Sequence, residues 1–461
     1  MRNPTHSQFF IDAEKISFDL SHRKTIQFNM GKYHAAVNAG KSRYANLEKT
    51  RERAATIKRK ALEFLPDYLE EFEKKHIENG GSVLWAHSAN DAIAYILEIL
   101  KKHDVSSVVK SKSMTTEEIE INDHLEKNNI QSIETDLGEY IVQLAGEKPY
   151  HIVTPAMHKS KNDIADLFHE HFNTSKQLTA EELTSIAREK LRQKFIHAGA
   201  GITGANFILP DIGGIAVTEN EGNAIMSTSF PKIHIAIAGI EKVIPSYKDL
   251  ALLWPHLSQH GTGQAITVYN SIFTGPKKEN ESNGPEKMYV ILLDNGRTNV
   301  YAEPDIDVSL SCIRCGACLN VCPIYTNIGG YTYNTTYQGP IGTVLTPHLK
   351  DFDSYIHLSS ACSVCGRCSE VCPVKIPLHE LILKNRQLAV SGKKTSFFEK
   401  NLMSLFTYAA SNSSRMDMVQ GNLKNSFFSL SGNRVWGDKR TFPKFAKNSF
   451  RNVYLKKNRK T

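Results

Sequence analysis

The N-terminal part of the chain shows a helical pattern of apolar and polar residues. Between residues 41 and 75, charges of alternating sign surround apolar residues at helical spacing, and Pro66 interrupts the pattern once. The apolar residues are Leu47, Ala54, Ile57, Ala61, Leu62, Leu65, Leu69 and Phe72. We therefore predict an N-terminal helical arm over residues 1–75 that packs on the domain after it.

Short apolar runs then alternate with helical patterns as far as residue 300. The predicted strands are residues 82–86, 106–110, a segment near Gln131, 151–154, 214–218, 234–238, 265–269 and 288–293. The predicted helices are residues 89–102 and 116–128, with further helices up to residue 198. Residues 276–285 are polar and predict a loop. Alternation of strands and helices predicts an α/β domain with a largely parallel sheet over residues 76–300.

All eight cysteines follow this domain, in two copies of one pattern. The spacing is C-x2-C-x2-C-x3-C-P, which is that of bacterial [4Fe-4S] ferredoxins. The first copy contains Cys312, Cys315, Cys318 and Cys322, and the second contains Cys362, Cys365, Cys368 and Cys372. Gly316 and Gly366 allow the left-handed backbone that so tight a loop requires. Soft thiolate ligands suit iron, so we predict two [4Fe-4S] clusters in a mainly helical domain over residues 301–390.

The cysteine before each proline is expected to serve the other cluster, as in two-cluster ferredoxins. One cluster is then predicted on Cys312, Cys315, Cys318 and Cys372, and the other on Cys362, Cys365, Cys368 and Cys322. Zinc ribbons and a disulfide framework are the alternatives. Zinc sites usually pair their ligands across a long insert, and no cysteine is left for a disulfide once both clusters form.

Charge is distributed unevenly along the chain. Residues 384–461 contain 17 Lys/Arg and three acidic residues, a net charge of +14, so the other 383 residues carry −6 of the total of +8. This distribution argues against nucleic-acid binding. The basic C-terminal segment, residues 391–461, is interpreted as a solvated end or as a surface that docks on an acidic partner or anionic lipid. Its aromatic residues indicate that part of it folds or binds a partner.

No apolar run is long enough to span a membrane, and the N-terminus lacks the apolar region of a secretion signal. Together with thiolates reserved for iron, this predicts a cytoplasmic protein, with peripheral association at the inner face of the membrane left open. The 39 residues between the cysteine runs are rich in Gly, Thr and Tyr, and either cover the clusters or form a docking surface.

Three other motifs lie outside the cysteine runs. Glu219 and Glu221 follow a predicted strand, where α/β sheets bind ligands, although the same residues suit a solvated turn. Lys110 and Lys112 also end a strand and could meet an anion, but an exposed basic turn is the commoner case. A G-x-G-x-x-G match at residues 199–204 follows a helical run and not a strand, so it does not predict dinucleotide binding.

The chain resembles the lactate utilization protein B (LutB/YkgF) family over almost its whole length. The resemblance is carried by the two cysteine runs and by residues 112–118, 201–206, 218–223 and 293–297. It implies an N-terminal LUD domain that is similar to the sugar-phosphate isomerase and CoA-transferase fold, a 2[4Fe-4S] ferredoxin-type domain and a short C-terminal domain.

The resemblance also implies a function, namely a part in oxidising L-lactate to pyruvate with LutA-like and LutC-like partners. We expect the chain to be an iron–sulfur electron-transfer subunit of an L-lactate dehydrogenase complex, and not the lone catalyst of that complex. The subunit would exchange electrons with protein carriers or the quinone pool. The alternative is a LUD-domain enzyme with CoA-transferase-like or isomerase-like chemistry, in which Glu219 or Glu221 is nucleophile or base and the clusters regulate or brace the fold.

Overall fold

Six parallel strands form the central sheet, in the order β1-β9-β7-β4-β2-β3. The strands are β1 (Ser82–Ala86), β2 (Ser107–Lys110), β3 (Gln131–Glu134), β4 (Ala200–Gly204), β7 (Ile233–Gly239) and β9 (Lys287–Leu293). The computed structural model describes residues 4–392, 397–426, 429 and 443–458. It divides into two units, Met1–Gln387 and Leu388–Thr461. The predicted parallel α/β sheet is confirmed.

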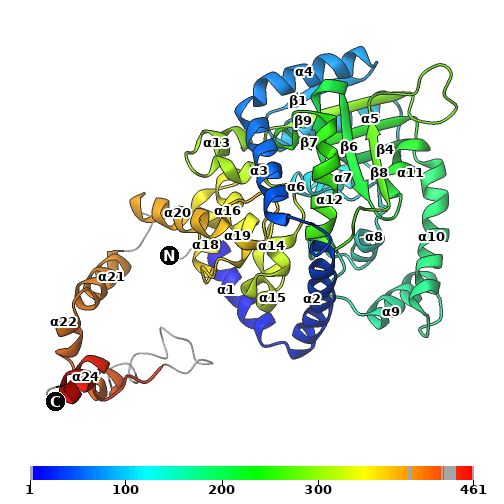
Figure 1. Ribbon diagram of the computed structural model, residues 1–461. Coiled ribbons are helices and arrows are strands. Elements are labelled where there is room, and N and C mark those ends of the chain that lie inside the picture. The colour runs from blue at the N-terminus through cyan, green and yellow to red at the C-terminus, as the bar shows by residue number, and fades with distance from the viewer. Residues whose placement is uncertain (1–3, 393–396, 427–428, 430–442, 459–461) are drawn as a thin grey trace. The chain divides into compact units, whose positions relative to one another are not determined.

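Helices cover both faces of this sheet (Figure 1). Successive residues of β9 point to opposite sides: Val290 packs in the cluster that contains α3 (Leu47–Glu63) and α4 (Leu65–Glu78), whereas Ile291 packs in the cluster that contains α5 (Ala89–Lys102) and α7 (Ile121–Lys127). The predicted apolar stripe of the N-terminal arm is thus the surface that α3 and α4 bury, through Ala61, Leu65, Leu69 and Phe72. A sheet covered on both faces explains why its central strands β7 and β9 are largely apolar.

A second, antiparallel sheet lies beside the first. It has three strands, in the order β5-β6-β8, formed by β5 (Phe207–Leu209), β6 (Gly214–Glu219) and β8 (Tyr269–Phe273). Ile208 and Ile215 of this sheet join the cluster formed by α4 and the large sheet. The remaining helices of this half are α1 (Pro4–Ser17), α2 (Leu20–Lys41), α6 (Met114–Glu118), α8 (Leu137–Leu144), α9 (Lys161–Phe172), α10 (Ala180–His197), α11 (Asn223–Ser229) and α12 (Leu250–Gly261).

Some predicted elements differ from the structure. The predicted strand at 151–154 is a bend, because His151 Nδ1 accepts from the N–H groups of Val153 and Thr154 and closes the chain on itself. The predicted strand at 265–269 overlaps a strand of the structure only at its last residue, because β8 begins at Tyr269. The predicted helix at 116–128 is two helices, separated at Glu120, which has a left-handed backbone with φ of 52°.

The cysteine-rich half is a set of short helices and loops. Its helices are α13 (Arg297–Ala302), α14 (Ala317–Asn320), α15 (Pro323–Ile328), α16 (Gly339–Leu349), α17 (Phe352–Tyr355), α18 (His357–Ala361), α19 (Arg367–Val371) and α20 (Leu378–Ser391). It shares one hydrophobic core with the N-terminal helices and the small sheet, since Ile26, Leu209, Leu253, Ile313 and Leu319 all belong to the same cluster.

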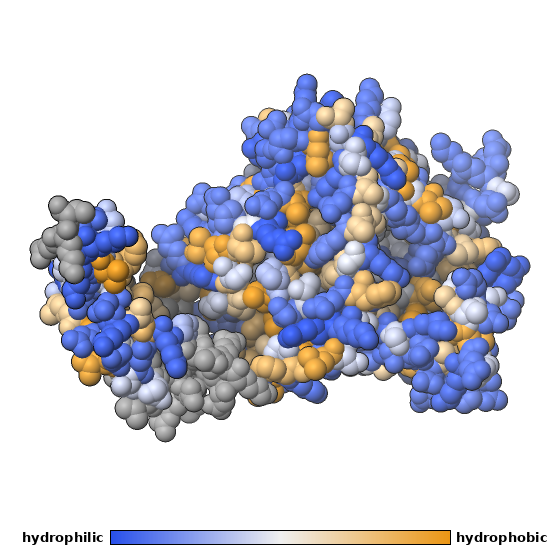
Figure 2. All heavy atoms as spheres, turned by 60° about the horizontal axis from the view of Figure 1, so that its bottom comes forward, coloured by the Kyte–Doolittle hydropathy of each residue, from blue (hydrophilic) through white to orange (hydrophobic). Residues whose placement is uncertain are grey.

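The second unit contains α21 (Phe397–Ala410), α22 (Ser413–Asp417) and α24 (Phe450–Asn458). Part of the aromatic tail therefore forms helices, whereas Phe427, Phe428, Trp436 and Phe442 lie outside the described residues. Within the described chain, no helix combines the length and apolarity needed to cross a membrane. On the face shown in Figure 2, polar residues predominate and apolar residues form small separate patches.

Candidate functional site

The first cysteine run folds as a tight loop against the α/β half. Arg314 and Gly316 have left-handed backbones, with φ of 58° and 78°, and the Arg314 N–H donates to Cys312 Sγ at 3.4 Å. A Cβ atom on residue 316 would lie 2.8 Å from Val153 Cγ2. Glycine is required here both by its backbone conformation and by the close approach of the neighbouring segment.

The second run repeats this backbone. Val364 and Gly366 have φ of 56° and 80°, and the Val364 N–H donates to Cys362 Sγ at 3.3 Å. The two sites differ in their surroundings, because a Cβ atom on Gly366 would meet open space. Cys365 is the exposed cysteine of the eight, while Cys315 and Cys318 of the first run are buried.

The last cysteine of each run lies apart from its own loop. Cys322 and Cys372 precede prolines, and their sulfurs accept the N–H groups of Tyr325 at 3.5 Å and Ile376 at 3.3 Å. A small cavity is lined by Cys312, Cys315, Cys318 and Cys372, three cysteines of the first run and the last of the second.

Cys322 lies near the cysteines of the second run. Burial raises the pKa of Cys322 to about 11, and the charges of Cys362 and Cys365 act in the same direction. Burial also raises the pKa of Cys368 to about 12, again together with the charges of Cys322 and Cys362.

These residues fit iron–sulfur clusters. Buried thiols with raised pKa values are poor thiolates unless a cation compensates their charge, and iron provides that compensation. Four sulfurs around one cavity, with backbone N–H groups directed at sulfur, suit the donor set of a [4Fe-4S] cluster. In the described part of the chain, no three His, Cys, Asp or Glu side chains are arranged to hold a metal ion by themselves.

A buried ion-pair network connects the carboxyl edge of the large sheet to the first run. Arg297 donates to both oxygens of Glu118, at 2.9 and 2.7 Å, and to Glu241 at 2.5 Å. Arg314, between the first two cysteines, lies 3.3 Å from the other oxygen of Glu241 and 4.3 Å from the ring centre of Tyr337. Although burial acts against it, Arg297 holds the pKa of Glu241 at about 2.

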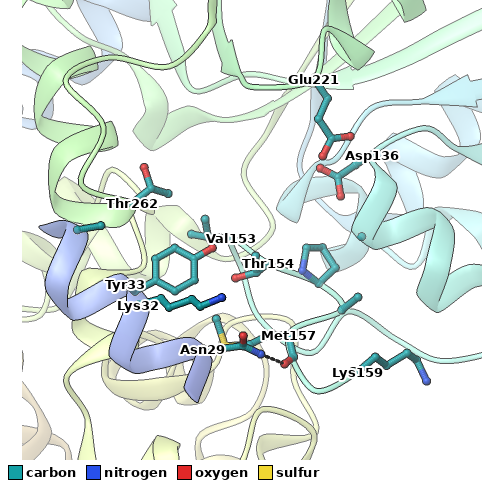
Figure 3. A pocket seen from close by; sticks show the side chains of 14 residues that line it. Asn29, Lys32, Tyr33, Asp136, Val153, Thr154, Met157, Lys159, Glu221 and Thr262 are labelled. Atoms are coloured by element: carbon teal, nitrogen blue, oxygen red, sulfur yellow. Dashed lines mark hydrogen bonds between the residues drawn. The ribbon is translucent and has the colours of Figure 1, made fainter. Parts of the chain in front are cut away.

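Glu219 and Glu221 are close in sequence but have different surroundings. Glu219 accepts the N–H groups of Ala224 at 2.6 Å and Ile225 at 3.0 Å, so it caps the start of α11. Glu221 accepts the N–H of Leu137 at 2.9 Å and remains accessible to solvent. Protein atoms around the Glu221 carboxyl remove part of its hydration although the residue is exposed, and together with the charge of Asp136 they raise its pKa to about 7. Figure 3 shows these two carboxyl groups pointing toward one another.

Glu221 and Asp136 line a cavity of about 520 Å³. Asn29, Lys32 and Tyr33 of α2 lie across the cavity from them (Figure 3). The cavity thus presents two carboxyl groups on one side and an amine, a phenol and an amide on the other, a mixed lining that suits a small polar molecule.

Lys110 is not in an exposed basic turn, and that interpretation is corrected. Its side chain is fully buried, with Nζ 2.7 Å from Glu134 and 2.9 Å from Glu117, and these carboxylates raise its pKa against the effect of burial. The ion pairs border a second cavity of about 570 Å³, lined also by Glu139 and by part of the insert between the cysteine runs. The insert therefore closes over the edge of the sheet at this point.

The G-x-G-x-x-G match lies mostly in β4 and is not a phosphate-binding loop. Buried basic residues near Cys312 that the sequence motifs missed are Lys58, Lys242 and Arg314. The sequence does contain a signal for the burial of Lys58, because Lys58 lies at helical spacing between Ala54 and Leu62 on the buried face of α3.

Comparison with known proteins agrees with this architecture. A family described as the LUD domain matches residues 69–293, and a 4Fe-4S dicluster domain matches residues 309–376. Lactate utilization protein B of Oceanobacillus iheyensis is 38% identical over 440 residues, which cover 93% of this chain and 92% of that protein. Lactate utilization protein B of Bacillus subtilis (strain 168) is 42% identical, covering 81% and 78%. An electron transport protein of Escherichia coli (strain K12), YkgF, described as uncharacterized, is 40% identical, covering 89% and 88%.

Proposed function

This chain belongs to the lactate utilization protein B family, and on that premise we propose that it is the electron-transfer subunit of a complex that oxidises L-lactate to pyruvate. The oxidation releases two electrons and two protons, and [4Fe-4S] clusters, when bound, supply one-electron transfer. The observation that carries the proposal is the cavity between Cys312, Cys315, Cys318 and Cys372, because it joins both cysteine runs at one site.

The proposed ligands follow from the two neighbourhoods of sulfur atoms. Cys312, Cys315, Cys318 and Cys372 hold one cluster, and Cys362, Cys365, Cys368 and Cys322 hold the other. The N–H groups of Arg314, Val364, Tyr325 and Ile376 stabilise negative charge on the sulfurs and fix their orientation.

The second run is the proposed point of contact with other electron carriers, because Cys365 is exposed and the first run is enclosed. LutA-like and LutC-like proteins are the proposed partners, with a protein carrier or the quinone pool as the further electron acceptor. Bound iron requires reduced thiols, so the proposed compartment is the cytoplasm.

The crossed ligand assignment predicts how paired substitutions change the iron content. Wild type should hold about eight irons, in two four-iron clusters. Cys315→Ser/Cys372→Ser removes two ligands from one cluster and should leave about four irons. Cys315→Ser/Cys322→Ser removes one ligand from each cluster and should weaken both. Iron analysis and the reduced-state paramagnetic spectrum measure the outcome, and the opposite pattern would show that each run holds its own cluster.

Activity separates the electron carrier from a second candidate, a LUD-domain enzyme. The second candidate is favoured by the cavity at Glu221, whose pKa near 7 suits a general base. With the partner proteins present, we expect Cys315→Ser to abolish lactate-dependent dye reduction and Glu221→Ala to change it little. Loss of activity in Glu221→Ala with retention in Cys315→Ser would instead support the LUD-domain enzyme. Circular dichroism of both variants controls for folding.

A further inference from the structure

Buried cations gather around the first cysteine run, and most of them come from the α/β half. Lys58 of α3 is 1% exposed and Lys242, just after β7, is 8% exposed. The side chain of Arg314, within the run itself, is 6% exposed. Buried cations are costly unless an anion or hydrogen bonds compensate them, so each of the three requires an explanation.

Carboxylates compensate these cations only in part. Lys58 Nζ donates to two backbone carbonyls, those of Glu241 at 2.7 Å and Val243 at 3.0 Å. Glu241 is shared between Arg297 and Arg314, and Glu118 is occupied by Arg297. Two carboxylates therefore face four basic side chains, so the carboxylates alone do not compensate all of them.

Cys312 is a neighbour that these cations share. Burial lowers the pKa of Lys58 to about 7 and that of Lys242 to about 8, while a negative charge on Cys312 favours the charged form of each. The same sulfur favours the charged form of Arg314. Nε and Nη1 of Arg314 are buried and have no hydrogen-bond partner among the described residues. The arrangement suits a larger anion at this place, as a cluster with four thiolates would be.

The second run has a different environment. Arg386 is partly exposed and donates to the backbone carbonyls of Ser359 and Cys362. Arg367, within the run itself, is exposed. The cavity at the first run has a comparable contact, from Arg51 to the carbonyl of Cys372, the second-run cysteine that lines it, in addition to its buried cations. Because Cys365 is exposed, water screens charges near the second run more than near the first.

We propose that Lys58, Lys242 and Arg314 raise the reduction potential of the cluster at the first run above that of the cluster at the second. Net charge, hydrogen bonds to sulfur and solvent exposure set such potentials, and a buried positive charge favours the added electron. An electron in this chain then rests at the buried first run and leaves through the exposed second run. The inference rests on the proposed function, since it requires both clusters.

A redox titration of full-length protein, followed by the paramagnetic signals of the reduced clusters, tests the inference. Wild type should show two one-electron steps. Lys242→Met should move the higher step to lower potential by about 59 mV, a tenfold change in the ratio of reduced to oxidised cluster. Glu241→Gln, at the neighbouring position, removes a negative charge and should move the same step upward. The lower step should stay in place in both variants.

Opposite shifts of the higher step in Lys242→Met and Glu241→Gln indicate an effect of charge. If the substitutions only disturbed the packing of the site, the step should move in the same direction in both variants. Lys375→Met is the matched control: Lys375 lies three residues after Cys372 but is paired with Glu48 and Glu52 at the surface, so neither step should move. If Lys242→Met does not retain iron, Lys58→Met provides the same measurement.

The inference is overturned if the variants hold about eight irons and the higher step stays in place, or if both shifts have the same sign. A wild-type protein without two clusters would instead overturn the proposed function, and iron analysis of each sample separates these results.

Discussion

His234 shows how a single buried residue couples stability to pH. It lies in β7 with no exposed surface, and its Nε2 atom is 2.7 Å from Thr203 Oγ1. Burial, with a smaller effect of His76, lowers the pKa of His234 to about 3. An unfolded histidine has a pKa near 6.5, so below that pH the unfolded chain binds a proton that the folded chain does not. The stability due to neutral His234 is present above pH 6.5 and is lost as the pH falls.

Substitution of His234 should therefore flatten the pH dependence of unfolding. Between pH 7 and pH 5, wild type should lose about 2 kcal/mol more than His234→Gln, since 1.5 pH units below pH 6.5 correspond to that free energy. Anaerobic urea unfolding at both pH values measures the difference. His197→Gln changes an exposed histidine and should follow wild type. An equal loss in His234→Gln and wild type would refute the assignment.

At the scale of single residues, the sequence predicted those whose conformation depends on the spacing of their neighbours in the chain. The paired loops at Cys312 and Cys362 share the left-handed glycine that their spacing predicts. The buried charges were not predictable in the same way. Lys58 contacts backbone atoms 183 and 185 positions away, and Lys110 meets Glu134 from a different strand. A charged residue is buried only when distant segments supply its partners, and no local pattern contains them.

At the scale of elements, β4 and β5 are the two strands that the sequence analysis did not predict, and β4 shows why. Two of its five residues, Gly201 and Gly204, are glycines, which disfavour strands and here match a loop motif. Tertiary packing explains them: a Cβ atom on Gly201 would lie 1.7 Å from the carbonyl oxygen of Ser227 in α11, and one on Gly204 would lie 2.5 Å from Ser113 Oγ. The helix approaches the strand too closely for any side chain.

A pair of glycine substitutions tests this explanation. Gly201→Ala should destabilise the protein by about 2 kcal/mol, because backbone atoms must move to admit the methyl group. Gly31→Ala lies in α2 with nothing within 4 Å of the added Cβ atom, and should stabilise by up to about 1 kcal/mol through helix propensity. Urea unfolding midpoints compare the two variants. A Gly201→Ala protein as stable as wild type would contradict the close packing of β4 and α11.

At the scale of the whole first unit, the sequence predicted the fold class of each region but not how the regions pack against one another. Alternation of apolar runs predicts the parallel sheet, and cysteine spacing predicts the helical iron–sulfur region, because both signals are periodic. The shared core was not predictable, since Ile26, Leu253 and Leu319 come from three separate parts of the chain. The insert between the cysteine runs was similarly ambiguous until its position beside the second cavity was known.

The enclosure of the first cysteine run has a consequence for the biogenesis of the protein. Cys315 and Cys318 of this run, and Cys372 of the second run, which lines the same cavity, are each less than 10% exposed, and the α/β half supplies part of their surroundings. We therefore expect metallation of this site to accompany the closing of the chain, because burial leaves these three cysteines little access to a scaffold protein. Under iron limitation we expect cells to accumulate an incompletely folded, protease-sensitive chain in place of a stable apoprotein.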